Sequence, residues 1–242
     1  MSYRALDQAA ILATAERLAA RIGERFPESG LSKVAAELVL VARESAQRIE
    51  DVRRPRWAIR IAVGAVIGAM LAIAIGLAIS APMPNSRIEL FPLLQVAESA
   101  VNDLIFLGIG GFFLVSLESR LKRRRALEAL HQLRSLAHVI DMHQLTKDPE
   151  QIRTPERRTE SSPTRILDRF ELARYLDYCS EMLSIISKIA ALHMQHMEDA
   201  QVQSAVDGVQ QLTTGLSAKI WQKIMIVDAM HAPPGTTGRP TA

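Results

Sequence analysis

The stretch LHQLRSLAHVIDMHQL, residues Leu130–Leu145, combines a helical apolar pattern with three histidines and an aspartate. Its core-facing apolar residues recur every third or fourth position: Leu130, Leu133, Ala137 and Ile140. This spacing places them along one face of an α-helix. The stretch therefore predicts one wall of a helical bundle, and it leaves open whether its histidines also form a site.

Similar helical patterns precede this stretch. Residues 5–24 carry apolar side chains at helical spacing, and this first helix should stop before Phe26 and Pro27. Ser32 can cap the next helix, which runs toward Pro55, where the missing N–H should kink or end it. We therefore expect two helices before residue 57.

Two further apolar stripes follow near the C-terminus. They extend from Leu176 to Met197 and, out of phase, from Val202 to Val227. A turn within Asp199–Gly208 would separate two helices of ordinary length. Before them, residues 149–164 contain three prolines and predict a mobile linker, in which Ser162-Pro163 is a good helix start.

The segment IAVGAVIGAMLAIAIGLAISA, residues Ile61–Ala81, contains twenty-one residues without a charge. At about 1.5 Å per residue, a helix of this length spans about 30 Å of hydrocarbon. The segment lies too far from Met1 to be a cleavable signal peptide. We therefore predict a first transmembrane helix over about residues 57–81.

A second apolar segment, Leu104–Leu117, has fourteen uncharged residues, fewer than the roughly twenty that cross a bilayer. Its flanks favour a span nevertheless, because only Arg87 lies between the two apolar segments. Nine basic residues lie outside them: Arg53, Arg54, Arg56, Arg60, Arg120, Lys122, Arg123, Arg124 and Arg125. By the positive-inside rule this predicts a hairpin in the plasma (inner) membrane, with a second span over about 97–118 and both termini cytoplasmic.

The expected fold class is an all-α membrane protein, in which a two-helix transmembrane hairpin carries a cytosolic antiparallel helical bundle. No strand signal or glycine-rich phosphate loop argues otherwise. The expected segments are cytosolic helices in 1–56, the hairpin in 57–120, a helix continuing the second span in 121–148, the linker in 149–164, bundle helices in 165–230 and a disordered tail in 231–242.

Basic residues beside the membrane should hold anionic lipid headgroups, at about 1 kcal/mol each. Those assigned this role are Arg53, Arg54, Arg56, Arg123, Arg124 and Arg125. The net charge of +3 is too small and too localised to indicate nucleic acid as a partner. The bilayer is therefore the expected charged partner.

The histidines suggest a metal or pH-sensing site as one alternative. Its candidate residues are Glu128, His131, His138, His193 and His196. A carboxylate-bridged metal bundle needs Glu-x-x-His on two helices, and only one such motif is present here. The pattern favours histidines that form hydrogen bonds within or at the edge of the bundle, so no cofactor is predicted and a transition metal remains the alternative.

Two features of the spans indicate assembly. Gly64, Gly68, Ala72 and Gly76 recur every fourth residue and form a smooth stripe for helix packing, within one chain or between chains. At the outer end of the second span, polar residues could form the mouth of a cation pathway or lie in the headgroup layer: Glu98, Asn102 and Asp103.

No catalytic constellation is visible, and an enzyme is the less favoured hypothesis. The single cysteine, Cys179, excludes an intramolecular disulfide, and its neighbours along the chain supply no cation to activate it. We therefore expect a non-enzymatic scaffold or regulator that forms homo-oligomers or binds a cytosolic protein. The alternatives are an oligomeric channel or membrane effector lined by the second span, and a metal-dependent enzyme that uses the histidine helices.

Overall fold

The computed structural model describes residues 5–53, 57–80, 90–147, 149, 167–195 and 197–229. Among these residues it contains six helices and no strand, which confirms the all-helical prediction for this part of the chain. The helices are α1 Gln8–Arg25, α2 Gly30–Arg53, α3 Trp57–Ser80, α4 Leu90–Leu145, α6 Arg169–Met194 and α7 Ala200–Ala229. The predicted linker, apart from Pro149, and the predicted tail lie outside the described residues.

The chain divides into two compact units, residues 52–124 and the remainder. The first unit contains α3 and the N-terminal part of α4. The second contains α1, most of α2, the C-terminal part of α4, α6 and α7. Helix α4 is therefore one uninterrupted helix whose two parts belong to different units. Its start at Leu90 is earlier than the predicted start near Ala97.

Short polar side chains set the ends of α1 and α2. Asp7 caps α1, because its carboxylate accepts hydrogen bonds from the N–H groups of Ala9 and Ala10. The hydroxyl oxygen of Ser29 accepts from the N–H of Ser32 at 3.1 Å, and α2 starts at Gly30. The predicted cap at Ser32 was therefore wrong, because the helix starts about one turn earlier and Ser29 is the residue that caps it.

The α6–α7 hairpin is also set by side-chain caps. Asp168 and Glu171 form a reciprocal capping box at the start of α6, while the predicted start at Ser162-Pro163 lies outside the described residues. Helix α6 ends at Met194, and the carboxylate of Asp199 accepts hydrogen bonds from the first turn of α7. The turn therefore lies between Met194 and Ala200, and only Asp199 of it belongs to the predicted range Asp199–Gly208.

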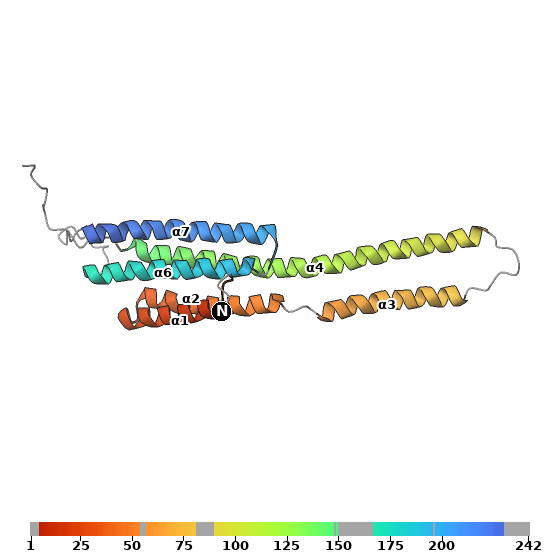
Figure 1. The fold of residues 1–242 in the computed structure, drawn as a ribbon, viewed down its shortest axis with the longest axis horizontal. Helices are drawn as coiled ribbons and strands as arrows, with labels where there is room; N and C mark the ends of the chain where they lie inside the picture. The colour runs from red at the N-terminus through yellow and green to blue at the C-terminus, as the bar shows by residue number, and fades with distance from the viewer. Residues whose placement is uncertain are drawn as a thin grey trace, which may run out of the picture. The chain divides into compact units, whose positions relative to one another are not determined.

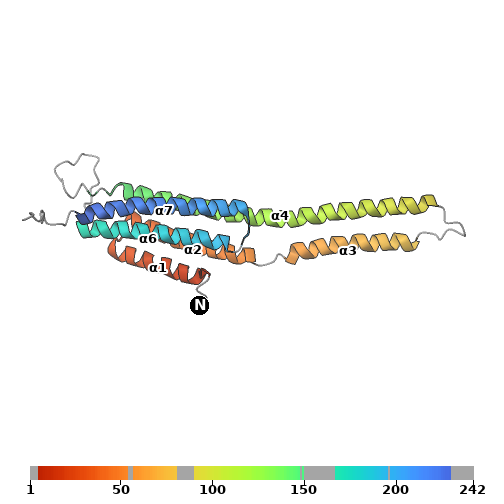
Figure 2. The same ribbon diagram turned by 45° about the horizontal axis from the view of Figure 1, so that its top comes forward.

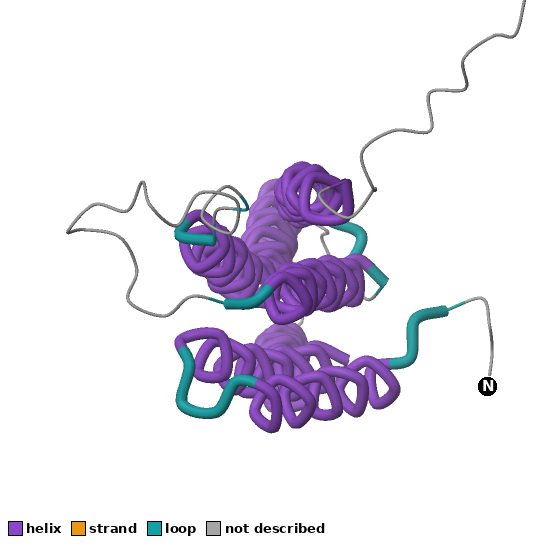
Figure 3. The backbone as a smooth tube through the Cα atoms, turned by 90° about the vertical axis from the view of Figure 1, so that its left-hand side faces the viewer, coloured by secondary structure: helices purple, strands orange, loops and turns teal. Residues whose placement is uncertain are grey.

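The larger unit has one hydrophobic core. Helices α6 and α7 lie side by side along the C-terminal part of α4, and α1 and α2 form a second layer (Figures 1 and 2). Figure 3 shows the two layers end-on. Every helix of the unit buries side chains in this core, including Ile22, Leu38, Leu133, Ile186 and Ile220. Full burial of such a side chain stabilises the fold by about 1.5–3 kcal/mol.

Helices α3 and α4 were predicted to cross a membrane, and the structure does not confirm this. Within the residues it describes, no helix is both long enough and apolar enough for a membrane span. Several side chains of α3, among them Ala62 and Val63, are outside the described set. The transmembrane hairpin therefore stays a prediction.

Candidate functional site

Phe26 anchors the contact between α1 and α6. Its side chain is 1% exposed and packs edge-on against Tyr175 and Tyr178, with ring centroids 5.5 and 6.2 Å apart. Edge-to-face pairs of this kind add about 0.5–1.5 kcal/mol beyond the area they bury. The end of α1 is thereby held against the first half of α6.

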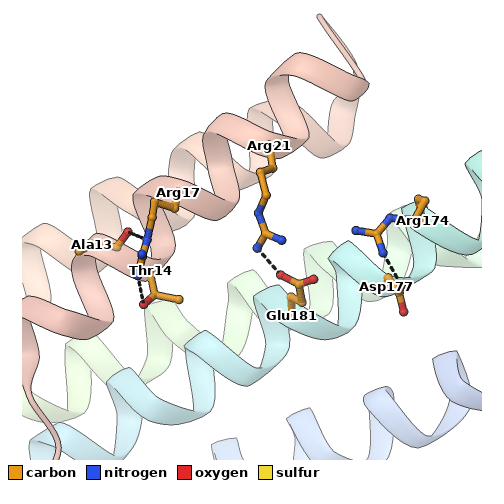
Figure 4. Close-up of polar contacts among 7 residues, drawn as sticks. All are labelled: Ala13, Thr14, Arg17, Arg21, Arg174, Asp177 and Glu181. Atoms are coloured by element: carbon orange, nitrogen blue, oxygen red, sulfur yellow. Dashed lines mark hydrogen bonds and ion pairs between the residues drawn. The ribbon is translucent and has the colours of Figure 1, made fainter.

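Arginine side chains surround this aromatic contact at the surface. The guanidinium groups of Arg21 and Arg174 lie 5.9 and 5.0 Å from the centre of the Tyr178 ring. Arg21 donates to Glu181 across the two helices at 2.7 Å, and Arg174 donates to Asp177 on its own helix at 3.0 Å (Figure 4). These contacts fix two cations on one aromatic ring.

Beside these groups lies a depression of about 500 Å³, lined by Arg21, Glu24, Arg25, Arg174 and Tyr178. Arg25 lies over the ring of Phe170 at 5.4 Å and forms no ion pair among the described residues. The hydrogen bond with Tyr178 is the largest influence on Arg174, and it raises the pKa of the guanidinium above its ordinary value. The depression therefore contains permanent positive charge.

A second depression, of about 490 Å³, lies where α1 begins beside α6. Leu6, Ile11 and Ile185 supply apolar lining, and Lys188 donates to the hydroxyl of Ser184 at 2.5 Å at its edge. The pair is exposed and lies one turn apart on one helix. Such an i, i+4 contact is ordinary on a helix surface.

Cys179 lies on α6 and is fully buried in the core of the larger unit. Burial raises the pKa of its thiol to about 12, although Lys223 and Lys147 act to lower it. The neighbours of Cys179 along the chain supply no cation, and both lysines come from distant parts of the sequence. Desolvation is the larger effect, so Cys179 is a protonated packing residue at neutral pH.

Lys223 also closes the end of α4. Its ammonium donates to the backbone carbonyls of Gln144 and Lys147 at 2.8 and 3.2 Å. The last carbonyls of a helix lack partners within the helix and carry partial negative charge. A lysine from α7 therefore caps α4, and sequence reasoning missed it because it lies more than seventy residues away along the chain.

The predicted histidine site is not assembled among the described residues. Glu128, His131 and His138 are exposed on α4, whereas His193 is buried on α6 and His196 is outside the described set. No group of three or more potential metal-binding His, Cys, Asp or Glu side chains occurs in the described part of the chain. The opposite face of the same stretch packs in the core, as its apolar spacing predicts.

The remaining predicted site residues belong mainly to α3 and the first part of α4. Glu98, Asn102 and Asp103 are exposed, and so is Ala72. A methyl group added at any of three stripe glycines would meet nothing within 4 Å among the described residues: Gly64, Gly68 and Gly76. At these three glycines, the described chain therefore leaves open space for an added methyl group.

The predicted headgroup arginines fall into two sets. Arg123 is half-buried, and Arg124 and Arg125 are exposed. The side chain of Arg53 is outside the described set, and so are Arg54 and Arg56 entirely. Nothing observed therefore tests their role at a membrane surface.

Sequence reasoning missed the arginine cluster at Tyr178. Its only signal was the i, i+4 pair Arg21 and Arg25, which reads as an ordinary solvated helix face. Arg174 lies far away in the sequence and joins the pair only through packing of α6.

No protein-family model, no curated protein and no solved structure matches this chain.

Proposed function

We propose that the chain is a membrane-anchored scaffold or regulator that acts by self-assembly rather than by catalysis. The observation that carries this proposal is the exposure of large apolar side chains on α3 and on the first part of α4. Ile79 is 79% exposed and Phe112 is 76% exposed. Exposed apolar surface of this extent needs a partner, and lipid is the partner that the charge-free run Ile61–Ala81 favours.

The charge distribution supports the same arrangement. Basic residues flank both apolar segments, and one basic residue lies between them. On this proposal the helical bundle lies in the cytoplasm. Two sets of arginines, Arg53, Arg54 and Arg56 and then Arg123–Arg125, contact the same anionic headgroup layer on that side.

The open glycine stripe supports association between copies. Gly64, Gly68 and Gly76 face no described part of their own chain, so the close helix packing that small residues permit would involve a second chain. The bundle, in contrast, completes its own core and can present a stable surface to a cytosolic protein.

Thiol labelling tests the membrane topology. The buried Cys179 should stay silent, so Ser86→Cys supplies one reactive thiol between the two apolar segments. A membrane-impermeant maleimide should label it in intact cells, and Ser204→Cys on α7 only after the cells are opened. Equal labelling of both positions in intact cells, or extraction of the protein from membranes by alkaline carbonate, would contradict the anchor.

Native mass spectrometry in detergent tests the assembly, since it reports subunit number and bound metal together. A defined oligomer supports the proposal, and a monomer at all protein concentrations contradicts self-assembly.

An oligomeric channel is the second candidate, because Glu98 and Asn102 lie one turn apart and exposed on α4 beside Asp103. Ion flux in liposomes that is lost in Glu98→Gln and Asp103→Asn would favour the channel.

A further inference from the structure

Three arginines from two helices converge on the depression beside Tyr178. Arg21 and Arg25 lie one turn apart on α1, and Arg174 comes from α6. We propose that this depression binds a phosphate group, with the three guanidinium groups as its ligands. The proposal concerns the larger unit alone, and it does not depend on membrane anchoring.

Each of the three arginines has guanidinium N–H donors left for a ligand. Arg21 uses its Nη2 atom for Glu181, and Arg174 uses its Nη1 atom for Asp177. A guanidinium group has several further N–H donors in a planar fork, so neither ion pair has to break when a ligand binds. Arg25 has no ion pair among the described residues, and its guanidinium carbon lies 5.4 Å from the centre of the Phe170 ring.

The site is held in place before any ligand arrives. The ring of Tyr178 is 2% exposed, is fixed edge-on by Phe26 and lies under the guanidinium groups of Arg21 and Arg174. Ordering long side chains in advance lowers the entropy cost of binding. A depression of about 500 Å³ leaves room for a phosphate group and part of the molecule that carries it.

The chemistry of the donors favours phosphate over a carboxylate. Three forked guanidinium donors lining one depression match an anion with several acceptor oxygens and about two negative charges. Among the described residues, Glu24 is the only acid that lines the depression. Glu181 and Asp177 neutralise part of the charge of Arg21 and Arg174. A singly charged ligand would therefore gain less than a phosphate or pyrophosphate group.

Calorimetric titration of the purified full chain with pyrophosphate tests the proposal. We expect saturable binding that Arg25→Ala weakens about tenfold, the effect of losing one charge-assisted hydrogen bond. Arg17→Ala is the matched control, because Arg17 lies on the same helix and bonds only within α1 (Figure 4). It should bind like the wild type, and Glu24→Gln should bind more tightly.

A thermal melt without ligand separates binding from folding. Arg25 takes no part in an ion pair that joins described helices, so Arg25→Ala should melt close to the wild type while it loses affinity. Short-chain phosphatidic acid, with phosphatidylcholine as its control, distinguishes a lipid headgroup from a soluble ligand. If the wild type binds neither pyrophosphate nor phosphatidic acid, or if Arg17→Ala weakens binding as much as Arg25→Ala does, the proposal is wrong.

Discussion

At the scale of single residues, the same amino acid has a different role according to what packing places opposite it. Gly30 begins α2 against the imidazole of His143, which lies where a methyl group on Gly30 would have to be. The glycines of α3 have open space at the same position. Of these glycines, only Gly30 would bring an added methyl group against another described side chain.

Gly30→Ala should displace the His143 ring and lower the free energy of unfolding by about 1 kcal/mol, because the ring must leave its preferred rotamer. Denaturant unfolding followed by circular dichroism measures this change. Gly23→Ala is the matched control, since its methyl group would meet the Ser32 hydroxyl at an ordinary 3.7 Å. The double variant Gly30→Ala/His143→Ala should lose the clash, and an undiminished penalty there would contradict this explanation.

Cys179 gives stability a dependence on alkaline pH. Its thiol titrates near 9 in an ordinary environment and at about 12 in the folded protein, because burial disfavours the thiolate. Between these values the unfolded chain loses a proton that the folded chain keeps, so the free energy of unfolding should fall as pH rises from about 9 to about 12. Unfolding measured across this range should show a shallower fall in Cys179→Ala, and an identical slope would contradict the assignment.

At the scale of elements, helix ends are set by two kinds of partner. Asp7, Asp168 and Asp199 cap the helices that follow them, within three residues along the chain. The end of α4 instead uses Lys223 from α7. The first kind depends on local sequence, whereas the second exists only when α7 is packed beside α4.

Lys223→Met should keep the aliphatic stem of the side chain and remove both hydrogen bonds to the end of α4. Hydrogen bonds to charged groups contribute about 1.5–3 kcal/mol, so we expect a loss of stability of this size and faster amide exchange near Gln144. Lys219→Met, one turn away on the exposed face of α7, is the control and should change neither. Protected amides at the end of α4 in Lys223→Met would show that the cap is not needed.

At the scale of the whole molecule, the two units differ in how their apolar side chains are satisfied. In the larger unit they pack into one core, to which α1, α2, α4, α6 and α7 all contribute. In the unit of residues 52–124, large side chains such as Leu104 and Phe106 are each 70% exposed. This exposed apolar surface is the observation on which we base the proposal that lipid or a second chain covers the smaller unit.

Gly68→Ile should reduce the subunit number seen by native mass spectrometry, because a bulky side chain would hold apart two helices that approach along the stripe. The melting of the bundle should not change, since Gly68 belongs to the other unit and a methyl group added there meets nothing within 4 Å among the described residues. Ala69→Ile changes the adjacent position off the stripe and should assemble normally. Equal assembly of both variants would remove the stripe from the proposed interface.

Several features of the fold were predictable because they depend on short-range sequence. The apolar spacing in Leu130–Leu145 correctly identified the buried face, with Leu133 and Ile140 in the core. The continuity of α4 past residue 118 also followed from an unbroken helical pattern. Helix starts were less accurate, because Ser29 and Ser32 are equally good caps until the path of the turn is known.

The candidate site was not predictable, because it depends on which helices become neighbours. The sequence by itself determined the helical class, the apolar faces and the contrast between two apolar segments and the more charged segments around them, since these follow from periodicity and composition. Only the tertiary structure decided that Arg174 joins Arg21 and Arg25, and that Lys223 reaches the end of α4. Helical periodicity determines which face of a helix is buried, but the choice of partner helix depends on the packing of side chains far apart in the chain.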